Sequence, residues 1–119
     1  MYDFGAKFRL KKKSDIQSLV NSGKFIRFKS FSVLLKKKDE GFSQIAISVS
    51  KKSGNAVVRN KVKRSIREIF RQSGMKDTGF QVLFMLRKRK VDMSKWNKFC
   101  EDISCDFSRL EDFCLDVKQ

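Results

Sequence analysis

One segment near the middle of the chain, residues 57–73, constrains the fold more than any other. At the 100° per residue of an α-helix, its apolar side chains gather on one stripe and its basic side chains on the adjoining stripe. The apolar stripe consists of Val58, Val62, Ile66, Ile69 and Phe70. The pattern predicts a helix that buries this stripe against a core and leaves its basic side accessible.

The basic stripe of this helix is nearly free of acidic residues. Its members are Arg59, Lys63, Arg67 and Arg71 at i, i+4 spacing, with Asn60 and Arg64 beside them. Like charges at this spacing destabilise an isolated helix by roughly 0.2–0.5 kcal/mol per pair. A solvated helix face usually mixes signs, whereas Glu68 is the only acid between Lys51 and Gln72. We therefore favour a face that binds a polyanion over a merely solvated one.

The distribution of charge along the chain favours a nucleic acid as the partner. The formal net charge is +15; residues 1–94 hold twenty-four Lys or Arg and seven Asp or Glu, while residues 95–119 hold four and six. Basic charge confined to part of a domain is the electrostatic footprint of a nucleic-acid binder. A membrane partner would require an apolar span or an amphipathic helix not needed for the core. We expect neither a membrane nor a small-molecule substrate.

The cysteines and the first residues of the chain indicate a cytoplasmic protein. Cys100, Cys105 and Cys114 are an odd number of thiols, and the N-terminus lacks the basic-then-apolar order of a signal peptide. Histidine and C-x-x-C pairs are absent from the sequence, so a metal site with three or four convergent ligands is not expected. Cys100 and Cys114 fall on the apolar side of the last amphipathic segment, which predicts that both pack in the core.

Periodicity along the rest of the chain predicts a single domain over residues 1–119. Ser14 and Gln17 form a capping-box pattern at the start of a short helix, and Gly23 follows its end. The expected elements are a basic, mobile arm over 1–13, a helix over 14–22, one or two strands over 24–37, a charged turn over 36–41, a strand over 42–50, the basic helix with Asn55 as its N-cap, a central strand over 80–86, a positive cluster over 87–90, a helix over 94–114 and a loose C-terminus over 115–119.

This order of elements predicts an α+β sandwich in which helices cover one side of a sheet. Within the strand over 42–50, the small residues Ala46, Ser48 and Ser50 share one face. They leave that face shallow next to Lys51 and Lys52, where it could admit an extended strand of nucleic acid.

A dense run of residues around the start of the basic helix carries a family resemblance. It comprises residues 46–52, then Gly54-Asn55-Ala56-Val57, then Arg59-Asn60-Lys61 followed by Lys63, Arg64, Arg67 and Glu68. Arg9-Leu10-Lys11-Lys12, Asp15 and Phe31 extend it. The whole resembles the signature of the protein subunit of bacterial ribonuclease P over roughly residues 8–112. The triplet matches that family's Arg-Asn-Arg motif, with lysine in the third place.

The resemblance implies a fold and a function. The fold would be α-β-β-β-α-β-α, with a mixed sheet and a left-handed β-α-β crossover around the basic helix. The function would be to assist endonucleolytic removal of the 5′ leader from precursor tRNA. In this family the large RNA subunit holds the catalytic centre and its Mg²⁺. The protein would be a non-catalytic subunit whose partners are ribonuclease P RNA and precursor tRNA, with no cofactor bound by its side chains alone.

The resemblance also implies two sets of binding residues. The positions that would contact the catalytic RNA are Arg59, Asn60, Lys61, Lys63, Arg64, Arg67 and Arg71. The positions in a leader-binding cleft between the first helix and the sheet would be Lys11, Lys12, Ile16, Val20, Phe31, Leu34, Ser48, Lys51 and Lys52. Aromatic side chains are common in this cleft in the family, yet Ile16, Val20 and Leu34 are aliphatic. We expect leader contacts that are more apolar and electrostatic, with weaker base preference.

Two other classes of function stay open. One is a general basic RNA-binding or annealing protein without a role in tRNA processing, which the charge permits. The other is a nuclease in its own right, which would need a general base such as histidine or a carboxylate cluster that binds metal. From residue 39 onward, the acids of the basic part are Asp39, Glu40, Glu68, Asp77 and Asp92, which are scattered over turns and a solvent face. We expect Glu68 to pair with neighbouring arginines, and we expect no catalytic residue in the protein.

Overall fold

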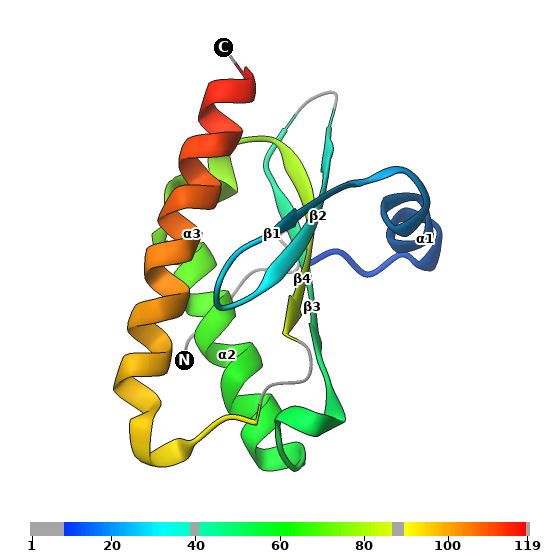
Figure 1. The fold of residues 1–119 in the computed structure, drawn as a ribbon. Coiled ribbons are helices and arrows are strands. Elements are labelled where there is room, and N and C mark those ends of the chain that lie inside the picture. The colour runs from blue at the N-terminus through cyan, green and yellow to red at the C-terminus, as the bar shows by residue number, and fades with distance from the viewer. Residues whose placement is uncertain (1–8, 39–40, 87–89, 119) are drawn as a thin grey trace.

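The computed structural model describes residues 9–38, 41–86 and 90–118 (Figure 1). Residues 1–8 of the expected arm, 39–40 of the charged turn and 87–89 of the positive cluster lie outside the described residues. The elements are α1 (Lys13–Ser22), β1 (Lys24–Arg27), β2 (Ser32–Lys37), β3 (Gln44–Val49), α2 (Ala56–Gln72), β4 (Phe80–Leu86) and α3 (Trp96–Lys118), with 3-10 turns at Lys51–Ser53, Gly74–Asp77 and Met93–Lys95. The α+β class and the order of helices and strands are confirmed.

The four strands form one mixed sheet in the order β1-β2-β4-β3. β1 is antiparallel to β2 and β2 to β4, while β3 and β4 run parallel and are connected through α2. β4 therefore lies between two neighbours, as predicted for a strand that is apolar on both faces. The register places Leu34 of β2, Leu83 of β4 and Ala46 of β3 in one row across the sheet.

Helices lie on both sides of this sheet. Figure 1 shows α2 and α3 on one side and α1 on the other. The main core fills the α2/α3 side, where Val33 and Phe84 of the sheet pack with Phe70 of α2 and Phe107 of α3. The expectation that helices cover one side holds for α2 and α3 only. α1 contacts β2 and β4 from the opposite side, because the second face of β4 is apolar as well.

The start and the buried stripe of α2 agree with the sequence. Asn55 caps the helix, since its Oδ1 accepts a hydrogen bond from the backbone nitrogen of Val58 at 3.0 Å. Val62 is fully buried in the core. Gly54 has a φ of 155°, and a Cβ there would lie 2.9 Å from the Val58 side chain. The turn before the helix therefore requires glycine.

The start of α1 differs from the sequence expectation. The helix begins at Lys13, and its N-cap residue Lys12 makes no side-chain capping bond. Ser14 and Gln17 lie inside the helix, so the predicted capping box is wrong. The point at which the chain enters α1 is set instead by pairing with β3, because the backbone nitrogen of Leu10 donates to the carbonyl of Ile45 at 3.0 Å. Leu10 is buried, so the end of the expected mobile arm is placed against the sheet.

The last helix is longer than predicted, since α3 continues to Lys118 rather than ending at residue 114. A buried carboxylate ties α3 to the turn between β1 and β2. Asp106 Oδ2 accepts hydrogen bonds from the backbone nitrogen of Ser30, at 2.9 Å, and from its hydroxyl. The pair fixes the β1–β2 turn, and with it the edge of the sheet, against the helix layer.

Candidate nucleic-acid interface

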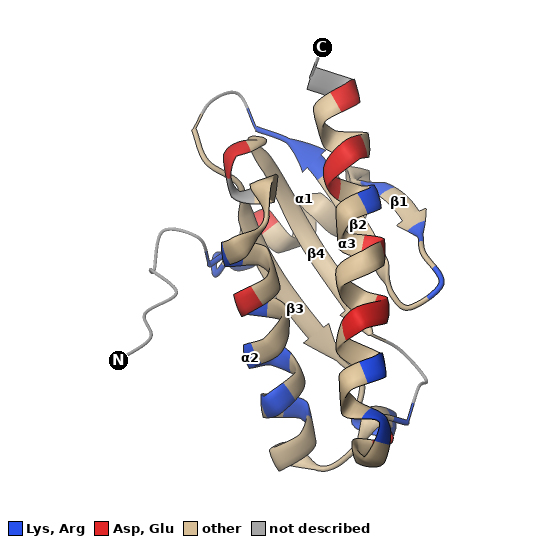
Figure 2. Cartoon of the chain, turned by 90° about the vertical axis from the view of Figure 1, so that its left-hand side faces the viewer, with Lys and Arg blue, Asp and Glu red and all other residues tan. Residues whose placement is uncertain are grey.

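The predicted basic stripe forms one side of α2, which we call the basic face. It consists of Arg59, Asn60, Lys63, Arg64, Arg67 and Arg71. Asn60 and Arg64 are exposed, and the others are half-buried. Figure 2 shows basic residues concentrated along α2 and acidic residues along α3. The helix thus brings the predicted RNA-binding side chains together, apart from Lys61.

Lys61 is directed toward α3 by an aromatic contact. Its Nζ lies 4.7 Å from the centroid of the Trp96 ring, within the range of a cation–π interaction. This agrees with its position about 100° from the centre of the basic stripe. The residue therefore helps to join α2 to the start of α3, and its contact with RNA stays a prediction.

The C-terminal end of the basic face is partly neutralised. Glu68 forms an ion pair with Arg71 and also accepts a hydrogen bond from Gln72 Nε2 at 2.8 Å. The expectation that Glu68 pairs with a neighbouring arginine is confirmed. Positive charge on α2 is accordingly strongest over its first turns, around Arg59, Lys63 and Arg64.

A second surface lies on the side of the sheet that α1 partly covers, which we call the α1-side face. Side chains of a strand alternate between its two faces, so this face takes the strand residues that do not enter the main core. They are Phe25, Arg27, Ser32, Leu34, Lys36, Gln44, Ala46, Ser48, Gln81, Leu83 and Met85. Lys36 confirms the direction, because its Nζ donates to Ser18 Oγ of α1 at 2.6 Å.

Most of the predicted leader-binding residues border the α1-side face. Leu34 is half-buried on it, and Ser48 is exposed near the end of β3. On α1, Ile16 is half-buried and Val20 is 50% exposed. The remaining lysines are exposed: Lys11 and Lys12 before α1, and Lys51 and Lys52 after β3. Their contact with RNA stays a prediction.

Phe31 is an exception that corrects the sequence prediction. It is 4% exposed and belongs to the main core, with its ring centroid 4.4 Å from that of Phe84 and 6.0 Å from that of Phe107. Phe31 therefore lies on the α2/α3 side rather than on the α1-side face. The cause is the alternation of the extended chain, which puts Phe31 in phase with the core residue Val33 and out of phase with Leu34.

Phe25 and Arg27 are surface residues that the sequence analysis did not assign to a site. Both are exposed and belong to the α1-side face through edge strand β1. Alternation over residues 24–37 is irregular because the chain turns between the two strands, where the backbone nitrogen of Phe28 donates to the carbonyl of Phe31 at 2.8 Å. If residues 24–27 are taken as a strand by themselves, period-2 alternation puts Phe25 and Arg27 on the same face. That local pattern is the sequence signal for this part of the surface.

The carboxyl ends of β3 and β4 meet at one edge of the sheet, because the two strands are parallel. The backbone nitrogen of Ser50 donates to the carbonyl of Leu86, and that of Val91 to the carbonyl of Ser53, both at 3.0 Å. These bonds place the segment that carries Lys51 and Lys52 beside the segment that begins at residue 90. Basic residues after two different strands thus share one edge.

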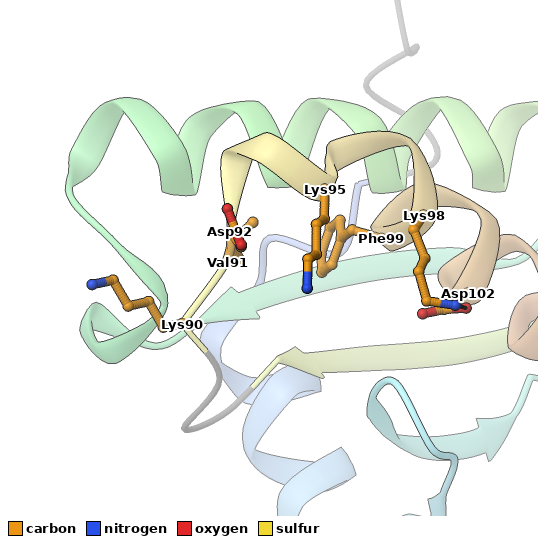
Figure 3. Close-up of a pocket in the computed structure, with 7 residues that line it drawn as sticks. All are labelled: Lys90, Val91, Asp92, Lys95, Lys98, Phe99 and Asp102. Atoms are coloured by element: carbon orange, nitrogen blue, oxygen red, sulfur yellow. Dashed lines mark ion pairs between the residues drawn. The ribbon is translucent and has the colours of Figure 1, made fainter.

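A pocket of about 200 Å³ opens next to this edge, between the chain after β4 and the start of α3 (Figure 3). It is lined by Lys90, Val91, Asp92, Lys95, Lys98, Phe99 and Asp102. Asp92 accepts from the hydroxyl and the backbone nitrogen of Ser94, and these bonds hold the pKa of its carboxyl below the usual range. Lys98 Nζ forms an ion pair with Asp102 Oδ1 at 3.8 Å. The pocket adds exposed positive charge to the edge.

Within the described residues, the charged groups of the two surfaces are mainly cations rather than clustered carboxylates or thiols. Across residues 9–38, 41–86 and 90–118, no three His, Cys, Asp or Glu side chains are grouped so that they could hold a metal ion. The chain contains no histidine. The arrangement supplies cations, hydrogen-bond donors and apolar surface, which are groups that can contact a polyanion.

The cysteines lie where the helical pattern predicts. Cys114 is buried, and burial raises the pKa of its thiol to about 12. Cys100 is half-buried, and burial raises its pKa as well. Cys105 is exposed on the opposite side of α3. The first two thiols are therefore packing groups of the helix layer.

Comparison with known proteins identifies the family. The family model described as Ribonuclease P matches residues 4–111 of the chain. The chain belongs to the ribonuclease P protein family. It is 36% identical over 88 residues to the ribonuclease P protein component of Staphylococcus epidermidis, covering 73% of this chain and 76% of that protein. It is 37% identical over 87 residues to the component of Thermotoga petrophila, covering 72% and 74%.

Solved ribonuclease P proteins share the fold. The Staphylococcus aureus protein superposes with a TM-score of 0.63 at 26% identity, covering 94% of this chain and 95% of that one. The Thermotoga maritima protein superposes with a TM-score of 0.60 at 31% identity, covering 92% and 93%. Membership of the ribonuclease P family makes the chain a component of an endoribonuclease complex that processes tRNA. No helix within the described residues is both long enough and apolar enough to span a membrane.

Proposed function

We propose that this ribonuclease P protein binds the catalytic RNA through the basic face of α2 and holds the 5′ leader of precursor tRNA along the α1-side face. The observation that carries the proposal is the joining of these two surfaces at Lys51 and Lys52. Those lysines follow β3, which belongs to the α1-side face, and they precede α2 by a short turn. An RNA strand on the sheet would thereby reach the catalytic RNA bound at the helix.

Phosphate contacts are assigned to the cations of α2. Arg59, Arg64 and Arg67 can each offer a phosphate two parallel hydrogen bonds, and Lys63 can add a point charge. Asn60 can both donate and accept, so it suits a base edge or a sugar hydroxyl. Because these groups lie on one helix, their spacing is rigid and matches a structured RNA better than a flexible one.

Leader binding is assigned to the shallow part of the α1-side face. Ser48 and Ala46 are small, so an extended strand can approach the backbone of β3. Ile16 and Val20 of α1 would form an apolar side of the path, and Lys11 and Lys12 would supply charge at its beginning. Leu34 would offer apolar contact in place of a stacked ring, which suits a leader of variable sequence.

Catalysis is assigned to the RNA subunit with Mg²⁺. The described side chains offer no cluster of carboxylates that fits a magnesium ion, and the charged groups of the two surfaces are mostly cations. The protein would help by neutralising phosphate repulsion between the two RNAs and by positioning the leader. Such a complex would operate in the cytoplasm, where precursor tRNA is made in bacteria.

The test is leader cleavage at low, near-physiological Mg²⁺ with a bacterial ribonuclease P RNA, with and without this protein, and with the protein alone. We expect cleavage at the mature 5′ end only when both components are present. Binding without any stimulation of the RNA would favour a general RNA-binding protein. Cleavage by the protein alone would contradict the proposal and indicate a nuclease.

A further inference from the structure

Edge strand β1 carries an exposed ring on the α1-side face. Phe25 is 54% exposed, more than any other aromatic side chain in the described parts of the chain. Its neighbours point the other way: Lys24 Nζ lies 4.8 Å from the ring centroid of Phe113 in α3, and Ile26 packs against the main core. Phe25 and Arg27 must therefore point to the side on which α1 lies.

The sheet register connects this ring to the proposed leader path. Phe25 is the partner of Leu34, which is the partner of Leu83, which in turn is the partner of Ala46. The row crosses three strand spacings, or about 14 Å. It begins at the exposed ring on β1 and ends at the small residue of β3, two residues before Ser48.

The chemistry around Phe25 favours a partner that is both flat and anionic. Arg27 lies two residues farther along the same face and is exposed, and no strand residue of the α1-side face is acidic. The next row across the sheet contains Arg27, Ser32 and Ser48, and its one apolar member, Met85, is buried. The exposed apolar surface is therefore too narrow for an amphipathic helix. An unpaired nucleotide supplies a π-face for the ring and a phosphate for the guanidinium.

We propose that Phe25 is a base-stacking residue for an unpaired nucleotide of the 5′ leader. The inference rests on the proposed function, because it needs the leader to lie on the α1-side face. It adds a contact at the β1 edge that favours precursor over mature tRNA, because the ring can stack on any unpaired base of the leader. Stacking at this position compensates for the aliphatic side chains of Leu34 and of the facing helix α1.

The experiment measures the affinity of the assembled protein–RNA complex for two ligands, a precursor tRNA with an unpaired leader and the mature tRNA. The variants are Phe25→Leu, which keeps apolar bulk, and Phe25→Trp, which keeps an aromatic ring. The control is Leu115→Ala, an exposed apolar residue on α3 (43% exposed). Thermal unfolding of each free variant verifies folding, and the exposure of Phe25 predicts native-like midpoints.

We expect Phe25→Leu to weaken binding of the precursor by about tenfold, the loss of one stacked base, without changing the affinity for mature tRNA. Phe25→Trp and Leu115→Ala should bind the precursor as the original protein does. A leader carrying 2-aminopurine should show quenched fluorescence in the complex, and Phe25→Leu should relieve the quenching at one leader position.

Two different failures can be told apart. If the original complex prefers the precursor and Phe25→Leu preserves that preference, the stacking inference is overturned while the proposed function stands. If the original complex shows no preference for a leader at all, the proposed function fails and the inference fails with it. An equal loss for precursor and mature tRNA would also overturn the inference, because stacking on the leader cannot affect a leaderless ligand.

Discussion

The basic face of α2 and the α1-side face of the sheet are built in different ways. The basic face belongs to one helix, so its spacing follows from helical geometry, and its chemistry is almost entirely positive charge. The α1-side face combines residues of four strands with α1, and it mixes small, apolar and basic groups. A one-helix surface suits a fixed array of phosphates, whereas a surface assembled across strands suits an extended strand that crosses them.

The largest expected effect separates the two sides of α2. Val62→Asp puts an unpaired charge at a fully buried position, and we expect a loss of about 3–5 kcal/mol in the free energy of unfolding. Asn60→Asp, two residues earlier and exposed, is the matched control and should fold normally. Circular dichroism during thermal unfolding measures both. Equal stabilities would show that the apolar stripe of α2 is not the buried one.

The next effect concerns the support of the α1-side face. Asp106→Ala removes the acceptor for the backbone nitrogen and the hydroxyl of Ser30, and leaving these donors buried should cost about 1–3 kcal/mol. Urea unfolding measures the change. Asp112→Ala, exposed on the same helix, should stay within about 0.5 kcal/mol of the original protein. If both variants behave alike, Asp106 does not anchor the β1–β2 turn.

A smaller effect isolates charge on the basic face. Arg64 is exposed, so Arg64→Ala should preserve stability while weakening association with the catalytic RNA. It should also flatten the dependence of log affinity on log salt by roughly one phosphate contact. Arg109→Ala provides the control, because Arg109 is an exposed cation on the acidic helix α3. An unchanged slope for Arg64→Ala would remove Arg64 from the interface.

The smallest effect comes from the core beneath both surfaces. Burial raises the pKa of Cys114 from 9.0 to about 12, so the folded protein keeps the thiol protonated while the unfolded chain ionises it. Stability from this group is complete below pH 9 and is lost as the pH rises toward 12, by at most about 1.4 kcal/mol per pH unit. Urea unfolding between pH 8 and 10 should show a shallower decline for Cys114→Ala. An equal decline in the free energy of unfolding for Cys114→Ala and the original protein would contradict the burial of the Cys114 thiol.

The two surfaces also differ in how far sequence predicts them. The position and the two sides of α2 can be predicted from local sequence. The Asn55 N-cap, the apolar stripe and the basic stripe all lie in one contiguous segment with helical periodicity. The α1-side face depends on pairing between distant segments. The sequence predicts Phe31 for the cleft and leaves Phe25 out of it, because the turn after β1 changes which residues of 24–37 share a face. The capping box at Ser14 failed for a related reason, since pairing of Leu10 with β3 sets the start of α1.

The central claim is that the two surfaces bind different RNAs, and a pair of matched variants tests it most directly. Arg64→Ala alters the basic face, and Ser48→Glu places an exposed negative charge on the α1-side face. The measurement is the affinity of the protein for ribonuclease P RNA, together with the ratio of affinities of the assembled complex for precursor and mature tRNA. The account predicts that Arg64→Ala lowers only the first quantity and Ser48→Glu only the second. Both variants changing the same quantity would contradict the division of the molecule into two RNA-binding surfaces.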